Sequence, residues 1–190
     1  MKGKKAPIII IVILVIVGFV FGFFGGGYNS LVKQQTAVET KQADIQTQLQ
    51  RRADLIPNFV ATVKGYTKYE QETLTAVTQA RASVAKATNA ESLSEANDQL
   101  DKAISVWVNA VTEAYPDLKA NSNYIALQDE FAGTENRIAT ARRDYNEAVQ
   151  KYNTMIKSFP KNILASMFNF EKAEFFAASS DSQTVPSVEF

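Results

Sequence analysis

SNYIALQDEFAGTENRIATARRDYNEAVQKYNTMIKSF, residues 122–159, carries an apolar residue at every seventh position. The repeat consists of Tyr124, Phe131, Ile138, Tyr145, Tyr152 and Phe159, and the adjacent positions hold Leu127, Thr134, Ala141, Ala148 and Met155. Because seven residues make about two turns of α-helix, this spacing places these side chains on one face. We therefore predict one long helix over residues 122–159. Gly133 lies inside it at a cost of about 1 kcal/mol relative to alanine, which predicts a close neighbouring backbone.

Another helix is predicted upstream, from Tyr28 to Pro57. Its apolar residues recur every three or four positions, at Tyr28, Leu31, Val38, Ile45, Leu49 and Ile56. Pro57 lacks an amide donor, so the chain either kinks or reverses there. Gln35, Gln42 and Arg52 occupy intervening positions of the seam. A seam that mixes apolar residues with glutamine is typical of a strip that fixes helix register.

Two more stretches between these helices have heptad patterns of their own. The first, over residues 57–87, repeats Val63, Glu70, Val77 and Val84. The second follows a loop at residues 88–90 and repeats Leu93, Leu100, Trp107 and Ala114. Ser92 and Glu95 are predicted to cap this helix, and Tyr115-Pro116 is predicted to end it. Trp107 is expected in the core.

The N-terminus contains an apolar run over residues 8–24, with no charge between Lys5 and Lys33. Seventeen helical residues span about 25 Å, and residues 25–27 extend this toward the roughly 30 Å of a bilayer core. A cleaved signal peptide is the alternative, but the run is long, ends in aromatic residues and precedes no A-x-A site. Lys2, Lys4 and Lys5 precede the run, which favours a cytoplasmic N-terminus and an extracytoplasmic domain.

The predicted fold is all-α, with an N-terminal transmembrane helix followed by an elongated antiparallel bundle of about four helices. Residues 1–27 would hold the cytoplasmic lysines, the anchor and a glycine hinge, residues 28–176 the bundle, and residues 177–190 a flexible tail. The apolar stretch after Pro160 is either the last piece of core or a membrane-facing patch. Pro186, Val188 and Phe190 are predicted to form a partner-binding motif. The alternatives are a disordered end and a tail that packs on the bundle.

Composition excludes several kinds of site. The chain has no cysteine and no histidine, which rules out thiolate or histidine metal ligation and Ser-His-Asp or Cys-His catalysis. After the first lysines the chain carries 17 basic and 20 acidic residues, an argument against sequence-independent binding to nucleic acid. We expect no cofactor, no metal ion and no small-molecule substrate.

Five charged residues fall on or beside the predicted core faces: Arg52, Glu70, Arg81, Glu135 and Arg142. Glu70 and Arg81 share the inner stripe of one helix, and Glu135 and Arg142 lie seven residues apart on one edge of another. Charges at such positions are usually paired with each other or reach the rim. We therefore predict a structural polar network with no catalytic role.

Several motifs resemble those of the LemA family. Residues 48–58, QLQRRADLIPN, look like the family signature, and TVKGY at 62–66 and YPDLKAN at 115–121 continue it. Further matches are LQ at 127–128, TENRIA at 134–139, AR at 141–142, YN at 145–146 and 152–153, and FP at 159–160. The resemblance covers the whole domain in order. Tyr69, where relatives often carry histidine, and Trp107, where a smaller aliphatic residue is expected, depart from it.

The resemblance implies a bacterial, single-pass protein of the inner cell membrane, with a helical bundle and no enzymatic activity. A related protein takes part in building magnetosome membranes, which points to membrane organisation. The expected function is a non-enzymatic scaffold or adaptor that binds unidentified proteins and self-associates through Gln35 and Gln42. The alternatives are direct membrane remodelling and an enzyme that uses core carboxylates. Carboxylate-bridged metal bundles need Glu-x-x-His pairs, which this chain cannot supply.

Overall fold

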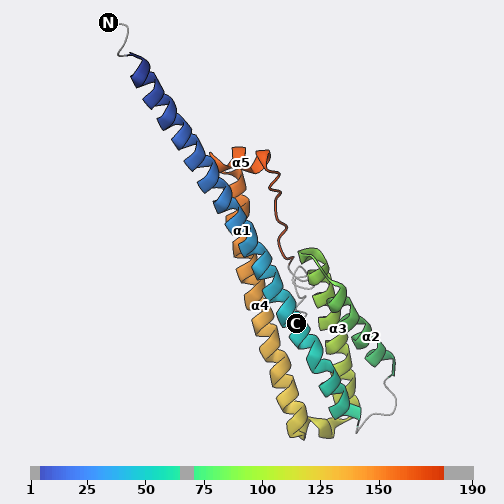
Figure 1. Ribbon diagram of the computed structural model, residues 1–190. Coiled ribbons are helices and arrows are strands. Elements are labelled where there is room, and N and C mark those ends of the chain that lie inside the picture. Colours follow the sequence, from blue (N-terminus) through green and yellow to red (C-terminus); the bar gives the residue numbers. More distant parts are fainter. Residues whose placement is uncertain (1–4, 65–70, 178–190) are drawn as a thin grey trace, which may run out of the picture. The chain divides into compact units, whose positions relative to one another are not determined.

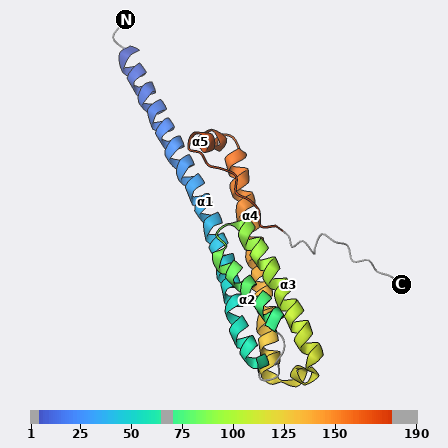
Figure 2. The ribbon, with the colours of Figure 1, turned by 90° about the vertical axis from the view of Figure 1, so that its right-hand side faces the viewer.

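The computed structural model describes residues 5–64 and 71–177 of the chain. Over these two ranges all regular structure is helical (Figures 1 and 2). The elements are α1 (Lys5–Lys64), α2 (Gln71–Lys86), α3 (Ala90–Ala114), the 3-10 helix η1 (Pro116–Ala120), α4 (Ser122–Lys157) and α5 (Lys161–Met167). The predicted all-α class is confirmed.

Two compact units divide the chain, and each combines segments that are distant in sequence. The N-terminal unit comprises residues 1–39 and 148–173, and the bundle unit comprises residues 40–147 and 174–190. Because α1 and α4 are long, each contributes one end to each unit. The domain boundaries predicted after residues 27 and 176 stay predictions.

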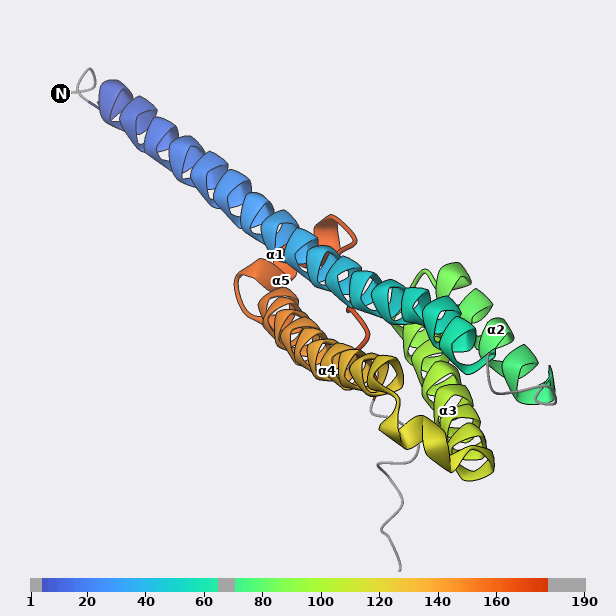
Figure 3. The same ribbon diagram turned by 90° about the horizontal axis from the view of Figure 1, so that it is seen from below.

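In the bundle unit, α1 and α4 run antiparallel. Lys41 on α1 pairs with Asp144 on α4 at 3.7 Å, and Arg51 pairs with Glu130 at 2.9 Å. Residue numbers therefore rise along α1 as they fall along α4. Helices α2 and α3 lie side by side and complete this unit (Figure 3).

Aromatic rings form the centre of the bundle core. Phe59 of α1 is fully buried, and its ring centroid lies 4.9 Å from that of Trp107, 5.3 Å from that of Tyr124 and 5.4 Å from that of Phe131. These four rings come from three helices. The contacts of Phe59 with Trp107 and Phe131 are edge-to-face, an arrangement that stabilises beyond the area that it buries. The predicted core position of Trp107 is confirmed.

The heptad face of α4 is buried as predicted, except at its last position. Tyr124, Phe131, Ile138, Tyr145 and Tyr152 are all at most 8% exposed, a set that spans four heptads. Phe159 is 81% exposed, so its predicted core position is wrong. The reason is that α4 ends at Lys157, and the chain leaves the helical register before Phe159.

Two predicted features of helix boundaries are resolved by the structure. Pro57 lies inside α1, which continues to Lys64, so the chain does not reverse there. Helix α3 is capped by Asn89: its Oδ1 accepts a bond from the Ser92 amide at 2.8 Å, and Ser92 Oγ accepts one from the Asn89 amide at 3.1 Å. The cap predicted at Ser92 is therefore three residues too late, because asparagine is itself a strong N-cap residue.

A small apolar core holds the N-terminal unit together. Leu31 of α1 is buried against Leu164 and Ala165 of α5. Partly buried side chains pack around them, namely Phe24, Met155, Ile156 and Phe170. The short helix α5 is thereby seated on α1.

Gly27 and Gly133 both lie inside helices but have different surroundings. A Cβ atom on Gly27 would lie 2.3 Å from Cδ1 of the buried Leu164, so α5 needs a glycine here to approach α1. A Cβ atom on Gly133 would meet no described atom within 4 Å. The close neighbouring backbone predicted at Gly133 is therefore absent from the described part of the chain.

We expect the same substitution at these two glycines to change stability in opposite directions. Gly133→Ala should raise the free energy of unfolding by about 0.5–1 kcal/mol, because alanine loses less backbone entropy on folding. Gly27→Ala should lower it by about 1–3 kcal/mol, because the added methyl group displaces Leu164. Chemical denaturation of both variants measures the two shifts. Shifts of the same sign would contradict this account of the two sites.

Within residues 5–64 and 71–177, no helix is both long enough and apolar enough to cross a membrane. The transmembrane helix predicted over residues 8–24 is therefore not confirmed by the structure. Residues 25–27, where a hinge was predicted, are helical and lie inside α1.

Candidate functional site

A charged cluster lies inside the bundle unit around Arg52 of α1. Arg52 is only 7% exposed, and its Nη1 forms ion pairs with Asp101 of α3 and, at 2.5 Å, with Oε2 of Glu135 on α4. One guanidinium group therefore joins three helices. A buried cation requires such compensation, because an unpaired charge is costly to remove from water.

Asp101 is a carboxyl group of this cluster, and it is only partly exposed. Burial raises the pKa of Asp101 above its usual range; the Arg52 guanidinium opposes this and the Glu135 carboxylate adds to it. Nδ2 of the fully buried Asn97 donates a hydrogen bond to Oδ2 of Asp101 at 2.8 Å. A raised pKa suits a general acid, but Asp101 contacts the Arg52 guanidinium and the Asn97 amide N–H, which are hydrogen-bond donors and cannot accept its proton. The geometry supports charge compensation.

No group of three or more Asp and Glu side chains in the described ranges is arranged to hold a metal ion. The two carboxylates of the cluster, Asp101 and Glu135, are both engaged with Arg52.

The structure brings together only part of the predicted polar network. Arg52 and Glu135 are in contact, but the Nη2 atom of Arg81 lies 3.4 Å from Oδ1 of Asp54. The guanidinium of Arg142 lies over the ring of Phe176, 4.9 Å from its centroid. Glu70 lies outside the described residues. Asp101, the second partner of Arg52, was missed because no periodic signal links it to that arginine.

The predicted partner-binding residues fall in three different places. Gln35 is exposed in the N-terminal unit. Gln42 is half-buried in the bundle unit, where its Nε2 donates a hydrogen bond to the Thr88 carbonyl at 2.8 Å. Pro186, Val188 and Phe190 lie outside the described residues. Association through these five residues stays a prediction, and the Gln42 amide is already engaged within the chain.

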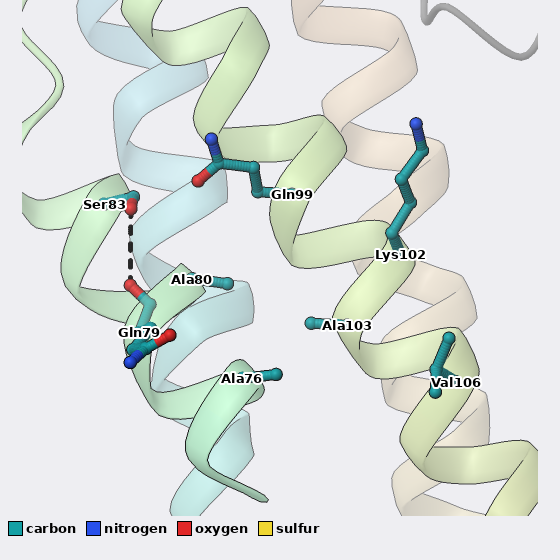
Figure 4. A pocket seen from close by; sticks show the side chains of 8 residues that line it. All are labelled: Ala76, Gln79, Ala80, Ser83, Gln99, Lys102, Ala103 and Val106. Atoms are coloured by element: carbon teal, nitrogen blue, oxygen red, sulfur yellow. Dashed lines mark hydrogen bonds between the residues drawn. The ribbon is translucent and has the colours of Figure 1, made fainter. Parts of the chain in front are cut away.

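An open groove between α2 and α3 was not predicted (Figure 4). It has a volume of about 680 Å³, and small or polar side chains line it: Ala76, Gln79, Ala80, Ser83, Gln99, Lys102, Ala103 and Val106. Ser83 Oγ donates a hydrogen bond to the Gln79 carbonyl at 3.3 Å, and Val106 is 59% exposed. The feature of the sequence that could have predicted this groove is the pair of alanines four residues apart, at 76 and 80. The groove offers space for an apolar side chain.

Asparagine side chains of α4 hold the segment that follows α5, residues 170–177, which we call the C-terminal strap. In the N-terminal unit, Asn153 Nδ2 donates to the Ala173 carbonyl at 2.8 Å, and the Ala173 amide donates to Asn153 Oδ1 at 2.9 Å. In the bundle unit, Asn146 makes the same two bonds with Phe176, at 3.2 Å and 2.9 Å. Each amide side chain thus satisfies both backbone groups of one strap residue.

The spacing of these contacts explains the repeated Tyr-Asn dipeptide. Asn146 and Asn153 are seven residues apart, a rise of about 10.5 Å along a helix. Ala173 and Phe176 are three residues apart, and three residues of extended chain cover about 10 Å. The hydroxyl group of Tyr145 adds a bond to the Glu174 carbonyl at 2.8 Å. The heptad spacing of the two dipeptides was the available signal for this role, which was not predicted.

Comparison with known proteins identifies relatives over most of the chain. The profile of the LemA family matches residues 41–190. Protein LemA of Metamycoplasma hominis is 28% identical, over 93% of this chain and 81% of that protein. Magnetosome protein MamQ 2 of Paramagnetospirillum magneticum is 24% identical, over 92% of this chain and 73% of that protein. Magnetosome protein MamQ of Magnetospirillum gryphiswaldense is 21% identical, over 78% of this chain and 64% of that protein.

The family match contains the residues of the charged cluster and of the strap contact in the bundle unit. Arg52 and Glu135 of the charged cluster lie inside it, as do Asn146 and Phe176 of the strap contact. Because the match covers well over half of the chain, including all of α2, α3, α4 and α5, the chain belongs to the LemA family.

Proposed function

We propose that this protein is a membrane-anchored, non-enzymatic scaffold that organises proteins or membrane at the bacterial cell envelope. The observation that carries the proposal is the exposure of apolar side chains on α1 over residues 10–17, which precede the small core around Leu31. Its described aliphatic side chains are exposed, at 58% for Ile10, 60% for Ile11, 53% for Ile13, 65% for Leu14, 66% for Val15 and 44% for Val17. An exposed set of aliphatic side chains of this size is stable in a lipid environment and unfavourable in water.

The distribution of charge supports a membrane next to the N-terminal unit. Residues 1–39 and 148–173 carry eight lysines and two glutamates, whereas the rest of the chain carries twelve basic and eighteen acidic residues. The three lysines before residue 8 favour a cytoplasmic N-terminus. We propose that the bundle unit lies outside the cytoplasm.

The scaffold proposal is preferred over an enzyme because the two carboxylates that contact the buried Arg52, those of Asp101 and Glu135, are both engaged in ion pairs with it. Direct membrane remodelling is the second candidate, and one observation favours it. Three relatives are named as magnetosome proteins, in line with the membrane organisation that the family resemblance implies.

Carbonate extraction of bacterial membranes that contain the full-length chain tests the anchor. We expect the protein to stay in the membrane pellet and the double variant Leu14→Lys/Val15→Lys to move largely to the supernatant, because lysine is costly at the bilayer centre. Val106→Lys, at an exposed apolar position of the bundle unit, is the control and should stay in the pellet. Extraction of the unmodified chain would overturn the anchor. An alkaline phosphatase fusion after Phe190, inactive in the cytoplasm, tests the orientation.

Crosslinking in the same membranes tests the scaffold role. Because the chain has no cysteine, Gln35→Cys provides a unique thiol on an exposed position. We expect this variant to form specific crosslinks, either between copies or to a partner identified by mass spectrometry. Gln42→Cys should crosslink less, since Gln42 is half-buried and bonded to Thr88. A chain that stays anchored but crosslinks at neither site would contradict self-association through this strip.

A further inference from the structure

Helix α5 is fixed to α1 immediately after the apolar run. Leu164 packs on Leu31 and fills the space above Gly27. Nζ of Lys161 donates a hydrogen bond to Ser30 Oγ at 2.9 Å, and Ser30 Oγ lies 3.6 Å from Met155 Sδ. These contacts hold one side of α5 against the part of α1 between Gly27 and Leu31.

Several large apolar side chains in and beside α5 are exposed. Phe159 is 81% exposed, Met167 56%, Ile163 50% and Phe168 48%. The ring of Phe168 also contacts that of Tyr28, at 4.8 Å between centroids, so the exposed surface continues onto α1. We call these four residues the α5 patch. Four large apolar side chains within ten residues are more than the single exposed hydrophobic residues that soluble surfaces normally carry.

Beside the patch lies a hollow of about 670 Å³ in the same unit. Apolar groups of Met155, Phe159 and Pro160 line it together with the lysines Lys151 and Lys161. Residues 148–173 carry four lysines and one glutamate. The patch therefore combines apolar side chains with positive charge, the chemistry of a surface that contacts anionic phospholipid.

The position of α5 along α1 indicates how deep the patch lies. If residues 8–27 span the bilayer core, Gly27 lies at its edge and Leu31 lies four residues, about 6 Å, past it along the helix. The headgroup region on each side of a bilayer is roughly 5–8 Å thick, so this depth corresponds to the interface between headgroups and water. Apolar side chains on a short helix and on the residues that flank it suit that layer.

We propose that the α5 patch is a second membrane contact, which lies in the headgroup layer of the membrane that the N-terminal run enters. The proposal rests on the proposed anchor. Together, the apolar run and the patch hold the N-terminal unit to the bilayer at two places. The occupant of the patch is the phospholipid surface; a second copy of the chain is the competing occupant.

Depth-dependent fluorescence quenching tests the proposal in the full-length chain. The variants Met167→Cys, Leu14→Cys and Val106→Cys are each labelled with an environment-sensitive fluorophore and reconstituted into vesicles of phosphatidylcholine and anionic phosphatidylglycerol. Lipids that carry a quencher near the headgroup or deep in the acyl chain report depth. We expect strong shallow quenching at position 167, strong deep quenching at position 14 and weak quenching by both lipids at position 106.

The three positions separate failure of the patch from failure of the anchor. Deep quenching at position 14 with position 167 no more quenched than position 106 would overturn the α5 contact and leave the anchor in place. Absence of deep quenching at position 14 would overturn the anchor, and with it the two-point attachment. Efficient disulfide formation between copies at Met167→Cys would show that a second copy covers the patch, which also overturns the proposal.

A paired substitution tests whether the patch side chains are responsible. Phe159→Ser/Ile163→Ser, made in the chain labelled at position 167, should reduce shallow quenching several-fold while position 14 keeps its deep quenching. Ile125→Ser, at a position 44% exposed in the bundle unit, is the matched control and should change neither. Fluorescence of the buried Trp107 verifies that each variant is folded. Unchanged shallow quenching in the folded double variant would contradict the role of these side chains.

Discussion

Phe59→Ala should lower the free energy of unfolding by about 3–5 kcal/mol, one of the two largest effects that we expect for this chain. Phe59 is fully buried and contacts the rings of Trp107, Tyr124 and Phe131. Removing its ring leaves a cavity among three other large side chains, which come from two helices, α3 and α4. Urea denaturation followed through the fluorescence of Trp107, the only tryptophan, measures the loss.

The control for this experiment is Phe175→Ala. Phe175 is 46% exposed, so its truncation should change the free energy of unfolding by no more than about 0.5 kcal/mol. A loss at Phe59 as small as that at Phe175 would mean that the aromatic cluster does not form as described. Because Phe59 lies beyond Pro57, a large loss would also confirm that α1 continues into the core past the proline.

Arg52→Gln should destabilise the bundle unit by about 1–3 kcal/mol, because it removes the buried cation that two partly exposed carboxylates contact. Asp101 and Glu135 would then face each other without the cation that both contact. The neighbouring Arg51 supplies a matched control, since its ion pair with Glu130, at 2.9 Å, is exposed. Arg51→Gln should cost at most about 1 kcal/mol. Equal losses for the two arginines would contradict the buried cluster.

The pH dependence of the Arg52→Gln variant provides a second readout. Because the pKa of Asp101 is raised in the folded protein, the folded state binds its proton more tightly than the unfolded state does. The contribution of Asp101 to stability therefore becomes more favourable as pH falls through its folded pKa. Without Arg52, the main influence that lowers this pKa is lost, so the recovery of stability on acidification should be larger than in the unmodified chain.

Periodic features of the sequence predicted the helices and most of the core. The heptad positions Tyr124 to Tyr152 are buried because a helix that packs along its whole length must repeat its contacts about every seven residues. The prediction failed at Phe159, where the helix ends, because a repeat in the sequence does not show where the backbone stops being helical.

Contacts between segments without a common period could not be predicted. Arg52 was identified as a buried polar residue, but its partner Asp101 is on another helix, and sequence spacing gives no information about such a pair. The bonds between Asn153 and Asn146 and the strap involve backbone groups of Ala173 and Phe176. Because every residue except proline has such groups, the residue types at 173 and 176 do not reveal these bonds. The apolar residues after Pro160 divide between core and surface, with Leu164 buried and Ile163 half exposed. Composition alone does not make that distinction.

The strap contacts also constrain how the length of the chain can change in evolution. An extra residue between Ala173 and Phe176 would lengthen an extended strap by about 3.3 Å, while the two asparagines would stay about 10.5 Å apart on their helix. One of the two amides would then lose its backbone partners, or the inserted residue would have to bulge away. A substitution at Glu174 or Phe175 carries no such penalty, since both are exposed. Insertions and deletions should therefore be rarer than substitutions in this segment among relatives that keep both asparagines.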